Sequence, residues 1–233
     1  MVACEAYFTS RSEVYFYCFS SVFLLFLKRI SSVFQLYFHR VSLISYLCSL
    51  INPFPMQSVA EKKKSQNIGE YLIYLYQMED LIRSFQGNME EIRQYVIAHY
   101  PVNEAEKEQI TAWFEGLLGK MNSEGILEKG HLQELNDLVE HLLQLHYRLL
   151  KTDKSYFETY HQAKPHILES ILTANGENPG NEIQICLNGI YGLLLCRLLG
   201  KKVNDEQLKA AEAFGEVLSL LNLAYQQELV ERN

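Results

Sequence analysis

Two Glu-x-x-His pairs are the first residues in this sequence whose types and spacing could do chemistry: Glu128 with His131, and Glu158 with His161. On a helix this spacing places a carboxylate and an imidazole one turn apart, as in helical bundles that hold two iron ions. The first pair spans Gly130, which supports rigid ligands poorly. With seven histidines and many glutamates, such pairs also arise by chance. We therefore expect no bound metal and no cofactor.

A second candidate metal face combines Glu134, Asp137 and His141, which lie at i, i+3 and i+7 and so share one side of a helix. We interpret them as the polar face opposite a leucine stripe. His99 and His161 fall on apolar faces, and we expect both to be hydrogen-bonded core histidines.

The cysteines do not form a disulfide framework. Cys186 and Cys196 share one predicted helix, where ten residues at about 1.5 Å rise separate them by roughly 15 Å. A buried thiol in so apolar a helix is inert. This pattern favours a reducing, cytoplasmic location, and no catalytic residue is identified.

Three polar side chains on the apolar helix at about 181–199 are candidates for lining a pocket: Asn188, Tyr191 and Arg197. They are equally suited to satisfying helix ends or bonding a neighbouring helix. The pocket interpretation belongs to an alternative function, a small-molecule or metal-dependent enzyme with its site between helices.

The first predicted helix carries aromatic residues on more than one side. Tyr71 lies on its apolar stripe, and Tyr74 and Tyr76 lie around it. A bundle helix needs only one apolar stripe, so we expect Tyr74 or Tyr76 to retain exposed surface. Exposed aromatic side chains of this kind mark partner sites, so both are candidate interface residues.

Charge argues against nucleic-acid partners. The chain has a formal net charge of -7; residues 1–55 hold four basic and two acidic residues, a net of +2, which leaves -9 for residues 56–233. An acidic domain repels phosphate. The one basic run, Lys62 to Lys64, precedes the first predicted helix and is expected to be a solvated tail.

Residues 1–55 differ in composition from the rest. They contain no Gly and no Asp and are dominated by Phe, Tyr, Ser, Leu, Val, Ile and Cys, whose codons are rich in thymine. The longest uncharged run, Val14–Leu27, is shorter than the roughly 20 apolar residues of a membrane-spanning helix. We predict that residues 1–55 are an upstream extension assigned in error and that the protein begins at Met56. A membrane or export segment, or a genuine soluble extension, remains the alternative.

Residues 56–233 predict an all-α fold, a single bundle of about seven helices. Apolar residues recur every three or four positions, and asparagine or aspartate caps precede most of these runs. The predicted helices cover about 65–85, 88–100, 103–121, 129–151, 153–175, 181–199 and 204–225. Pro165 predicts a kink or a restart in the fifth helix.

The sixth helix, at about 181–199, is apolar almost all round, which predicts a central position in the fold. Gly189 and Gly192 are each unfavourable inside a helix by about 1 kcal/mol relative to Ala. We expect them to mark a close crossing with another helix.

Two stretches resemble a known family: NIGEYLIYLYQMEDLIRS at 67–84 and NEIQICLNGIYGLLLCRLLGKKV at 181–203. They are similar to an uncharacterised all-helical family of Bacteroides-type bacteria, known only as a domain of unknown function. The resemblance covers about Met56 to the C-terminus. It implies no activity and no site residue.

The sequence thus favours a non-catalytic cytoplasmic helical domain that acts through protein–protein contact or self-association. The enzyme alternative would be favoured by a pocket in which Asn188, Tyr191 or Arg197 meets the carboxylates of a second helix.

Overall fold

The computed structural model describes residues 56–174 and 178–232, which form eight α-helices and one short 3-10 helix without any strand. The helices are α3 (Met56–Gln66), α4 (Ile68–Ser84), α5 (Met89–Tyr95), η1 (Ile97–His99), α6 (Glu104–Ser123), α7 (Gln133–Thr152), α8 (Lys154–Thr173), α9 (Glu182–Leu198) and α10 (Asp205–Arg232). The predicted all-α fold is confirmed. The predictions for residues 1–55 lie outside the described residues.

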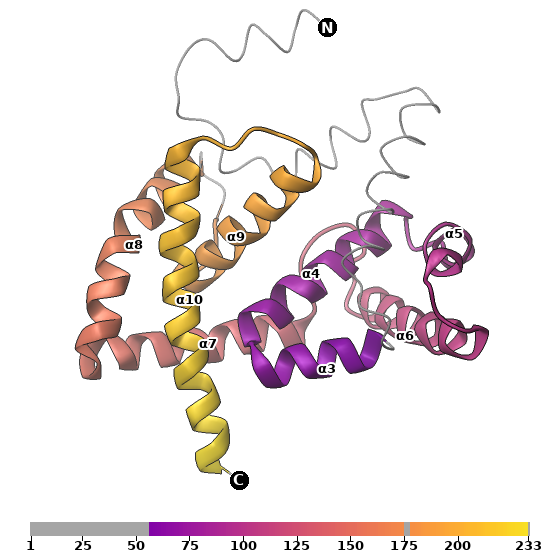
Figure 1. Ribbon diagram of the computed structural model, residues 1–233, viewed down its shortest axis with the longest axis horizontal. Helices are drawn as coiled ribbons and strands as arrows, with labels where there is room; N and C mark the ends of the chain where they lie inside the picture. Colours follow the sequence, from indigo (N-terminus) through magenta and orange to yellow (C-terminus); the bar gives the residue numbers. More distant parts are fainter. Residues whose placement is uncertain (1–55, 175–177, 233) are drawn as a thin grey trace, which may run out of the picture.

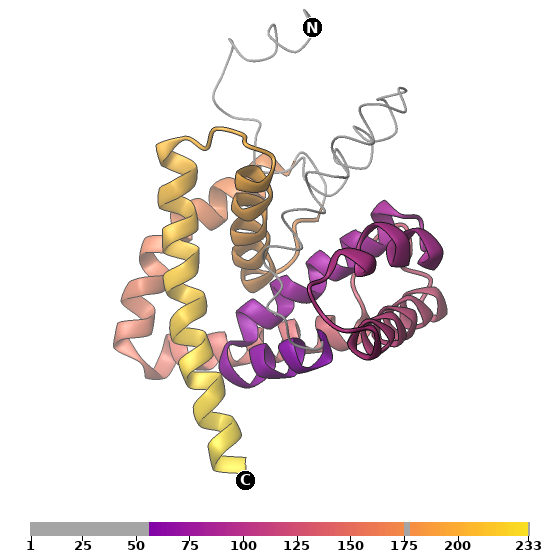
Figure 2. The same ribbon diagram turned by 45° about the vertical axis from the view of Figure 1, so that its right-hand side comes forward.

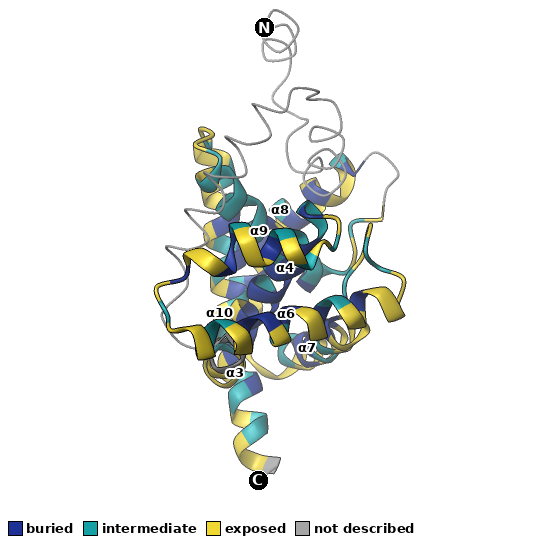
Figure 3. Ribbon diagram, turned by 90° about the vertical axis from the view of Figure 1, so that its right-hand side faces the viewer, coloured by how far each residue is buried: buried dark blue, intermediate teal, exposed yellow. Residues whose placement is uncertain are grey.

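The helices form a bundle in which α4 and α7 connect two groups (Figure 1). One group contains α8, α9 and α10, and the other contains α5 and α6. The long helix α10 packs along α9 and α8 and also contacts α7 and α4 (Figure 2). Buried segments gather where α4, α8 and α9 lie, whereas the C-terminal end of α10 is half-buried or exposed (Figure 3).

Side-chain caps start most helices where the sequence predicts them. A capping side chain satisfies backbone N–H groups that have no partner in the first turn. Asn67, Asn88, Asn103, Asp153 and Asn181 each accept a hydrogen bond from the first turn of the helix that follows. Asn103 and Glu106 form the predicted capping box, and Asn204 with Gln207 repeats it at the start of α10.

The predicted solvated tail around Lys62 to Lys64 is instead part of helix α3, which packs on α4 and α6. Lys63 forms an ion pair with Glu70 at 3.1 Å. The Lys64 ammonium lies 5.4 Å from the centre of the Tyr71 ring. The lysines are therefore attached to α4 by charge and by aromatic contact, neither of which appears in hydrophobic periodicity.

A buried asparagine fixes the junction between α3 and α4. The Asn222 carboxamide, on α10, accepts from the backbone N–H of Ile68 at 3.0 Å and donates to the carbonyl of Gln66 at 3.3 Å. One side chain thus satisfies the end of α3 and the start of α4, groups that helix ends leave without partners.

Helix α9 contacts α4, α7, α8 and α10, in keeping with a central position. Gly189 is buried, but Gly192 does not mark a close crossing. A Cβ placed on Gly192 would meet no atom of the described residues within 4 Å. The reason is that burial is complete only in the N-terminal half of α9, while the half that contains Gly192 is partly exposed.

Helix α8 continues without interruption through Pro165, so the predicted restart does not occur. Proline removes the backbone donor that would bond to His161. Both residues lie on the exposed side of α8, where water can satisfy the free carbonyl. Within the described parts of the chain, no helix combines the length and apolar character needed to cross a membrane.

Candidate functional site

Two buried polar clusters and one exposed apolar face are the features of this fold that could carry function. The first cluster joins α4 to the loop between α6 and α7 and to α9. The second, which we call the histidine junction, joins α7, α8 and α9. The exposed face lies on α8.

The first cluster is centred on Glu79, a fully buried carboxylate on α4. Glu79 accepts from the backbone N–H of Leu132 at 3.0 Å and pairs with Nδ1 of His131 at 2.6 Å. Leu132 is the N-terminal cap residue of α7, and its own side chain cannot cap. The carboxylate of Glu79 therefore replaces the missing cap from another helix, at the end where negative charge is favourable.

Arg83 holds the same loop one turn further along α4. Its guanidinium donates to the carbonyls of Ile126 and Gly130 and pairs with Asp80 at 2.9 Å. The loop between α6 and α7 is thus fixed by α4 through both charges and backbone carbonyls. These bonds have a structural purpose, although Nε of Arg83 is buried without a hydrogen-bond partner in the described structure.

A line of polar side chains on α9 faces a similar line on α4. The Tyr191 hydroxyl donates to Asp80 at 2.7 Å, and the Tyr76 hydroxyl donates to Gln184 at 3.2 Å. The Gln184 amide donates to Asn188 at 2.9 Å. Burial, with a smaller contribution from Asp80, raises the pKa of Tyr191 well above its usual range, so the phenol is a neutral donor.

Of the three candidate pocket residues, the structure brings two into this line of contacts. Tyr191 meets the carboxylate of Asp80, and Asn188 is exposed and reaches α4 only through Gln184 and Tyr76. Arg197 lies exposed in the last turn of α9, two turns beyond Asn188.

The histidine junction is a chain of four side chains from three helices. Nδ1 of His146, on α7, lies 2.7 Å from the Tyr156 hydroxyl. Its Nε2 lies 2.9 Å from Glu182, which also accepts from Tyr160 at 2.8 Å. His146 and Tyr156 are almost completely buried, and Glu182 is partly exposed at the start of α9.

One arrangement of protons gives every donor in this chain an acceptor. A carboxylate only accepts, so Nε2–H of His146 and the Tyr160 hydroxyl both donate to Glu182. Nδ1 is then free to accept from the Tyr156 hydroxyl, which makes His146 neutral. Burial lowers the pKa of His146 and outweighs the hydrogen bond and charge of Glu182, which act in the opposite direction.

Both clusters contain residues that the sequence analysis missed. His146 follows Leu142 by four positions and Val139 by seven, so it lies on the leucine stripe of α7. Glu79 stands in the same relation to Leu75 and Leu72 on α4. A polar residue on an apolar stripe was the available signal, since burial obliges such a group to find a partner.

The exposed face lies on α8, opposite the residues that enter the core. The outer face of α8, as we call it, has residues spaced by three or four positions. It consists of Phe157, His161, Lys164, Leu168, Ile171 and Leu172. The apolar members are 47, 49, 43 and 81% exposed, in chain order. They are four of the eight large hydrophobic residues that are exposed in the described parts of the chain.

Comparison with known proteins identifies a family but no function. The model of the family described as "Domain of unknown function (DUF4924)" matches residues 57–231, which includes almost all of α3 to α10. The chain belongs to this family. Searches of curated proteins and of solved structures found no match. The DUF4924 domain therefore covers both clusters and the outer face of α8.

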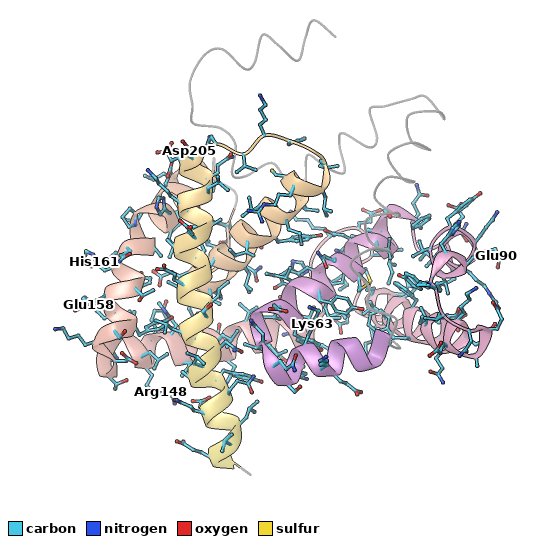
Figure 4. All side chains as sticks on the ribbon, in the orientation of Figure 1. Lys63, Glu90, Arg148, Glu158, His161 and Asp205 are labelled. Carbon is cyan, nitrogen blue, oxygen red and sulfur yellow. The ribbon has the colours of Figure 1, made fainter. Side chains whose placement is uncertain are left out.

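The DUF4924 domain does not arrange its Glu-x-x-His pairs as ligands. The fourth helix begins at Gln133 rather than near Lys129, so Glu128 lies exposed in the preceding loop while His131 turns to Glu79. Glu158 and His161 both project outward from α8 (Figure 4). In the described part of the domain, no three His, Cys, Asp or Glu side chains are grouped so that they could hold a metal ion.

The second candidate metal face is also divided among separate partners. Glu134 pairs with Lys120 at 2.9 Å, and Asp137 accepts from Gln133 at 2.8 Å. His141 contacts Glu228 of α10 at 3.0 Å. Glu134 and His141 thus connect α7 to α6 and α10, while Asp137 bonds within α7 itself.

The prediction that His99 and His161 are core histidines is wrong, because both are exposed. His99 lies in η1 rather than in α5, and the change of helical period turns its side chain outward. His161 belongs to the outer face of α8. Its apolar neighbours along the chain form a second, exposed stripe and not the core stripe.

The expectation that Tyr74 or Tyr76 retains exposed surface is not met. Tyr74 is 6% exposed and Tyr76 is fully buried. Tyr76 stacks on the His131 ring with centroids 3.7 Å apart, and Tyr74 lies against Trp113 of α6 at 6.4 Å. Helix α4 is surrounded by α3, α6, α9 and α10, so it buries more than one stripe.

Both cysteines of the DUF4924 domain are free thiols. Cys186 is completely buried beside the histidine junction, and burial raises its pKa, with a smaller contribution from Glu182. A thiol that remains protonated is a weak nucleophile, which agrees with the structural role predicted for Cys186.

Proposed function

We propose that this DUF4924 domain is a non-catalytic helical module that acts through protein–protein contact, self-association included, and that the outer face of α8 makes the contact. The observation that carries the proposal is the pattern of exposure on α8. Tyr156, Tyr160 and Ile167 enter the core, whereas Phe157, Leu168, Ile171 and Leu172 remain exposed on another side.

An apolar side chain exposed alone needs no explanation, but a group of neighbouring ones does. Leu168, Ile171 and Leu172 form such a group at the C-terminal end of the outer face, beyond His161 and Lys164. Burying an apolar side chain contributes about 25 cal/mol per Å² removed from water, and a stripe left in water forgoes that stabilisation. Contiguous exposed apolar patches mark contact sites in soluble proteins. The proposed contact thus moves from Tyr74 and Tyr76, as expected from the sequence, to α8.

The proposal includes a cytoplasmic location in a bacterium of the Bacteroides type. The two free cysteines are compatible with a reducing compartment. The resemblance of the two stretches at 67–84 and 181–203 supports the bacterial origin.

The test is the oligomeric state of two matched variants. Leu168→Glu with Leu172→Glu places charge on the outer face of α8, and Leu223→Glu makes the same change at an exposed position on α10. Light scattering coupled to size exclusion should show an assembly for the wild type and for Leu223→Glu, but a monomer for the double variant. If the wild type is a monomer, the purified protein should instead bind proteins from an extract of the native cells. The double variant at Leu168 and Leu172 should then lose those proteins, and Leu223→Glu should keep them. Equal behaviour of both variants would refute the proposal.

A second candidate function is an enzyme whose site lies between α4 and α9. One observation favours it: Tyr191 converges with Asp80 of a second helix, and Asp80 is partly exposed. The Tyr191 phenol would serve there as a hydrogen-bond donor. Tyr191→Phe separates the two functions, because it removes that donor without altering the outer face of α8.

A further inference from the structure

We infer that the histidine junction is an acid-sensitive latch, which holds the N-terminal half of α8 against α7 and α9 only while His146 is neutral. The inference is independent of the proposed function. It rests on the directions of the hydrogen bonds that connect Tyr156, His146, Glu182 and Tyr160.

The neutral state satisfies the whole chain of bonds. Nε2–H of His146 donates to Glu182, and Nδ1 accepts from Tyr156. Tyr156 and Tyr160 both belong to α8, so the chain attaches two consecutive turns of that helix. The bond between His146 and Tyr156 is buried, so water cannot readily replace it, whereas Glu182 is partly exposed.

Protonation of His146 reverses one bond of the chain and displaces the hydrogen of the Tyr156 hydroxyl. Nδ1 would then carry a hydrogen directed at the Tyr156 oxygen, 2.7 Å away. Tyr156 would have to turn its own hydrogen elsewhere, yet its hydroxyl is buried and has His146 as its hydrogen-bond partner. A buried donor without an acceptor is unfavourable, so acid weakens the attachment of α8.

The surroundings of the ring do not offset this effect. Burial raises the pKa of both tyrosines of α8 and of Cys186 on α9, so all three stay protonated and neutral. Tyr147 on α7 contacts the His146 ring through its own aromatic ring. Glu182 is the one carboxylate that contacts the ring in the described structure. On α10, Glu228 and Tyr225 face His141, more than one turn away along α7.

The sign of the pH dependence follows from the lowered pKa of His146. The unfolded chain binds a proton at an ordinary value of about 6.5, whereas the folded protein binds it only at lower pH. Stability from this group is therefore complete above about pH 6.5 and is lost as the pH falls below it.

Nitrogen NMR of the histidine rings in the purified protein tests the latch directly. His146 should be neutral with its hydrogen on Nε2 at pH 7.5, and should titrate below the ordinary histidine value of about 6.5. A hydrogen on Nδ1, or a titration midpoint at or above 6.5, would overturn the inference.

Thermal unfolding gives the second readout. The Tm of the wild type should fall between pH 7.5 and 5.5, and His146→Gln should reduce that fall because it cannot be protonated. The control is His141→Gln, on the same helix and also beside a carboxylate, which should keep the wild-type fall. An equal fall in all three proteins would contradict the latch. If His146→Gln does not fold, the NMR titration decides alone.

Discussion

At the residue scale, the buried polar and charged side chains of this protein connect helices to one another. Glu79 caps α7 from α4, and Arg83 fixes the preceding loop. Asn222 links the ends of α3 and α4 from α10. Each replaces a partner that the local sequence lacks, which explains why polar residues interrupt otherwise apolar stripes.

Replacing Glu79 should therefore cost far more than replacing a surface glutamate. Glu79→Met keeps the size of the side chain but leaves the N–H of Leu132 without an acceptor. We expect a loss of about 1–3 kcal/mol in the free energy of unfolding, as for other buried donors deprived of a partner. Urea denaturation measures it.

Glu108→Met is the matched control for this prediction. Glu108 pairs with Arg93 on the surface, and both side chains are more than half exposed. Exposed ion pairs contribute about 0–1 kcal/mol. Similar losses at both positions would mean that Glu79 is not a cap for α7.

At the element scale, the helices could be predicted from the sequence because their signals are local. Spacing of apolar residues and asparagine caps depends on neighbours within about four positions, and these predictions are confirmed for α4, α6 and α10. Helix α3 was not predicted because the contacts that hold it, from Lys63 and Lys64 to α4, join two different helices and leave no local pattern.

The candidate sites were less predictable because exposure depends on which helices pack together. Tyr74 and Tyr76 are buried since α4 packs against α3, α6, α9 and α10, whereas Leu172 lies on a face of α8 that no described helix covers. When a helix has two apolar stripes, its sequence is the same whether other helices cover one stripe or both. The exposure of the second stripe therefore cannot be predicted from the sequence.

Gly192 provides a prediction about α9. A Cβ at this position meets no described atom within 4 Å, and glycine is unfavourable inside a helix. Gly192→Ala should stabilise the protein by about 0.4–1 kcal/mol, through helix propensity and a less flexible unfolded chain. The measurement is the urea midpoint.

Gly180→Ala should have the opposite effect. Gly180 has a φ of +87°, and a Cβ there would lie 2.8 Å from the Gln184 side chain. Destabilisation by Gly192→Ala would show that a close neighbour does cover this part of α9, as the sequence alone suggested.

At the scale of the whole molecule, α8 carries four of the eight large hydrophobic residues that are exposed in the described parts of the chain. Helix α8 lies at the edge of the bundle in Figure 1, attached through α7, α9 and α10. The histidine junction controls that attachment from the inside, and the outer face of α8 offers contact from the outside.

The central claim is that the outer face of α8 contacts a protein in the cell. A photoreactive phenylalanine analogue at Leu168 tests it most directly, with the same analogue at Leu223 for comparison, since both side chains are about half exposed. Irradiation of the native cells should give a discrete cross-linked product from position 168 and none from position 223. Identical patterns from both positions, or no product from position 168, would contradict the account.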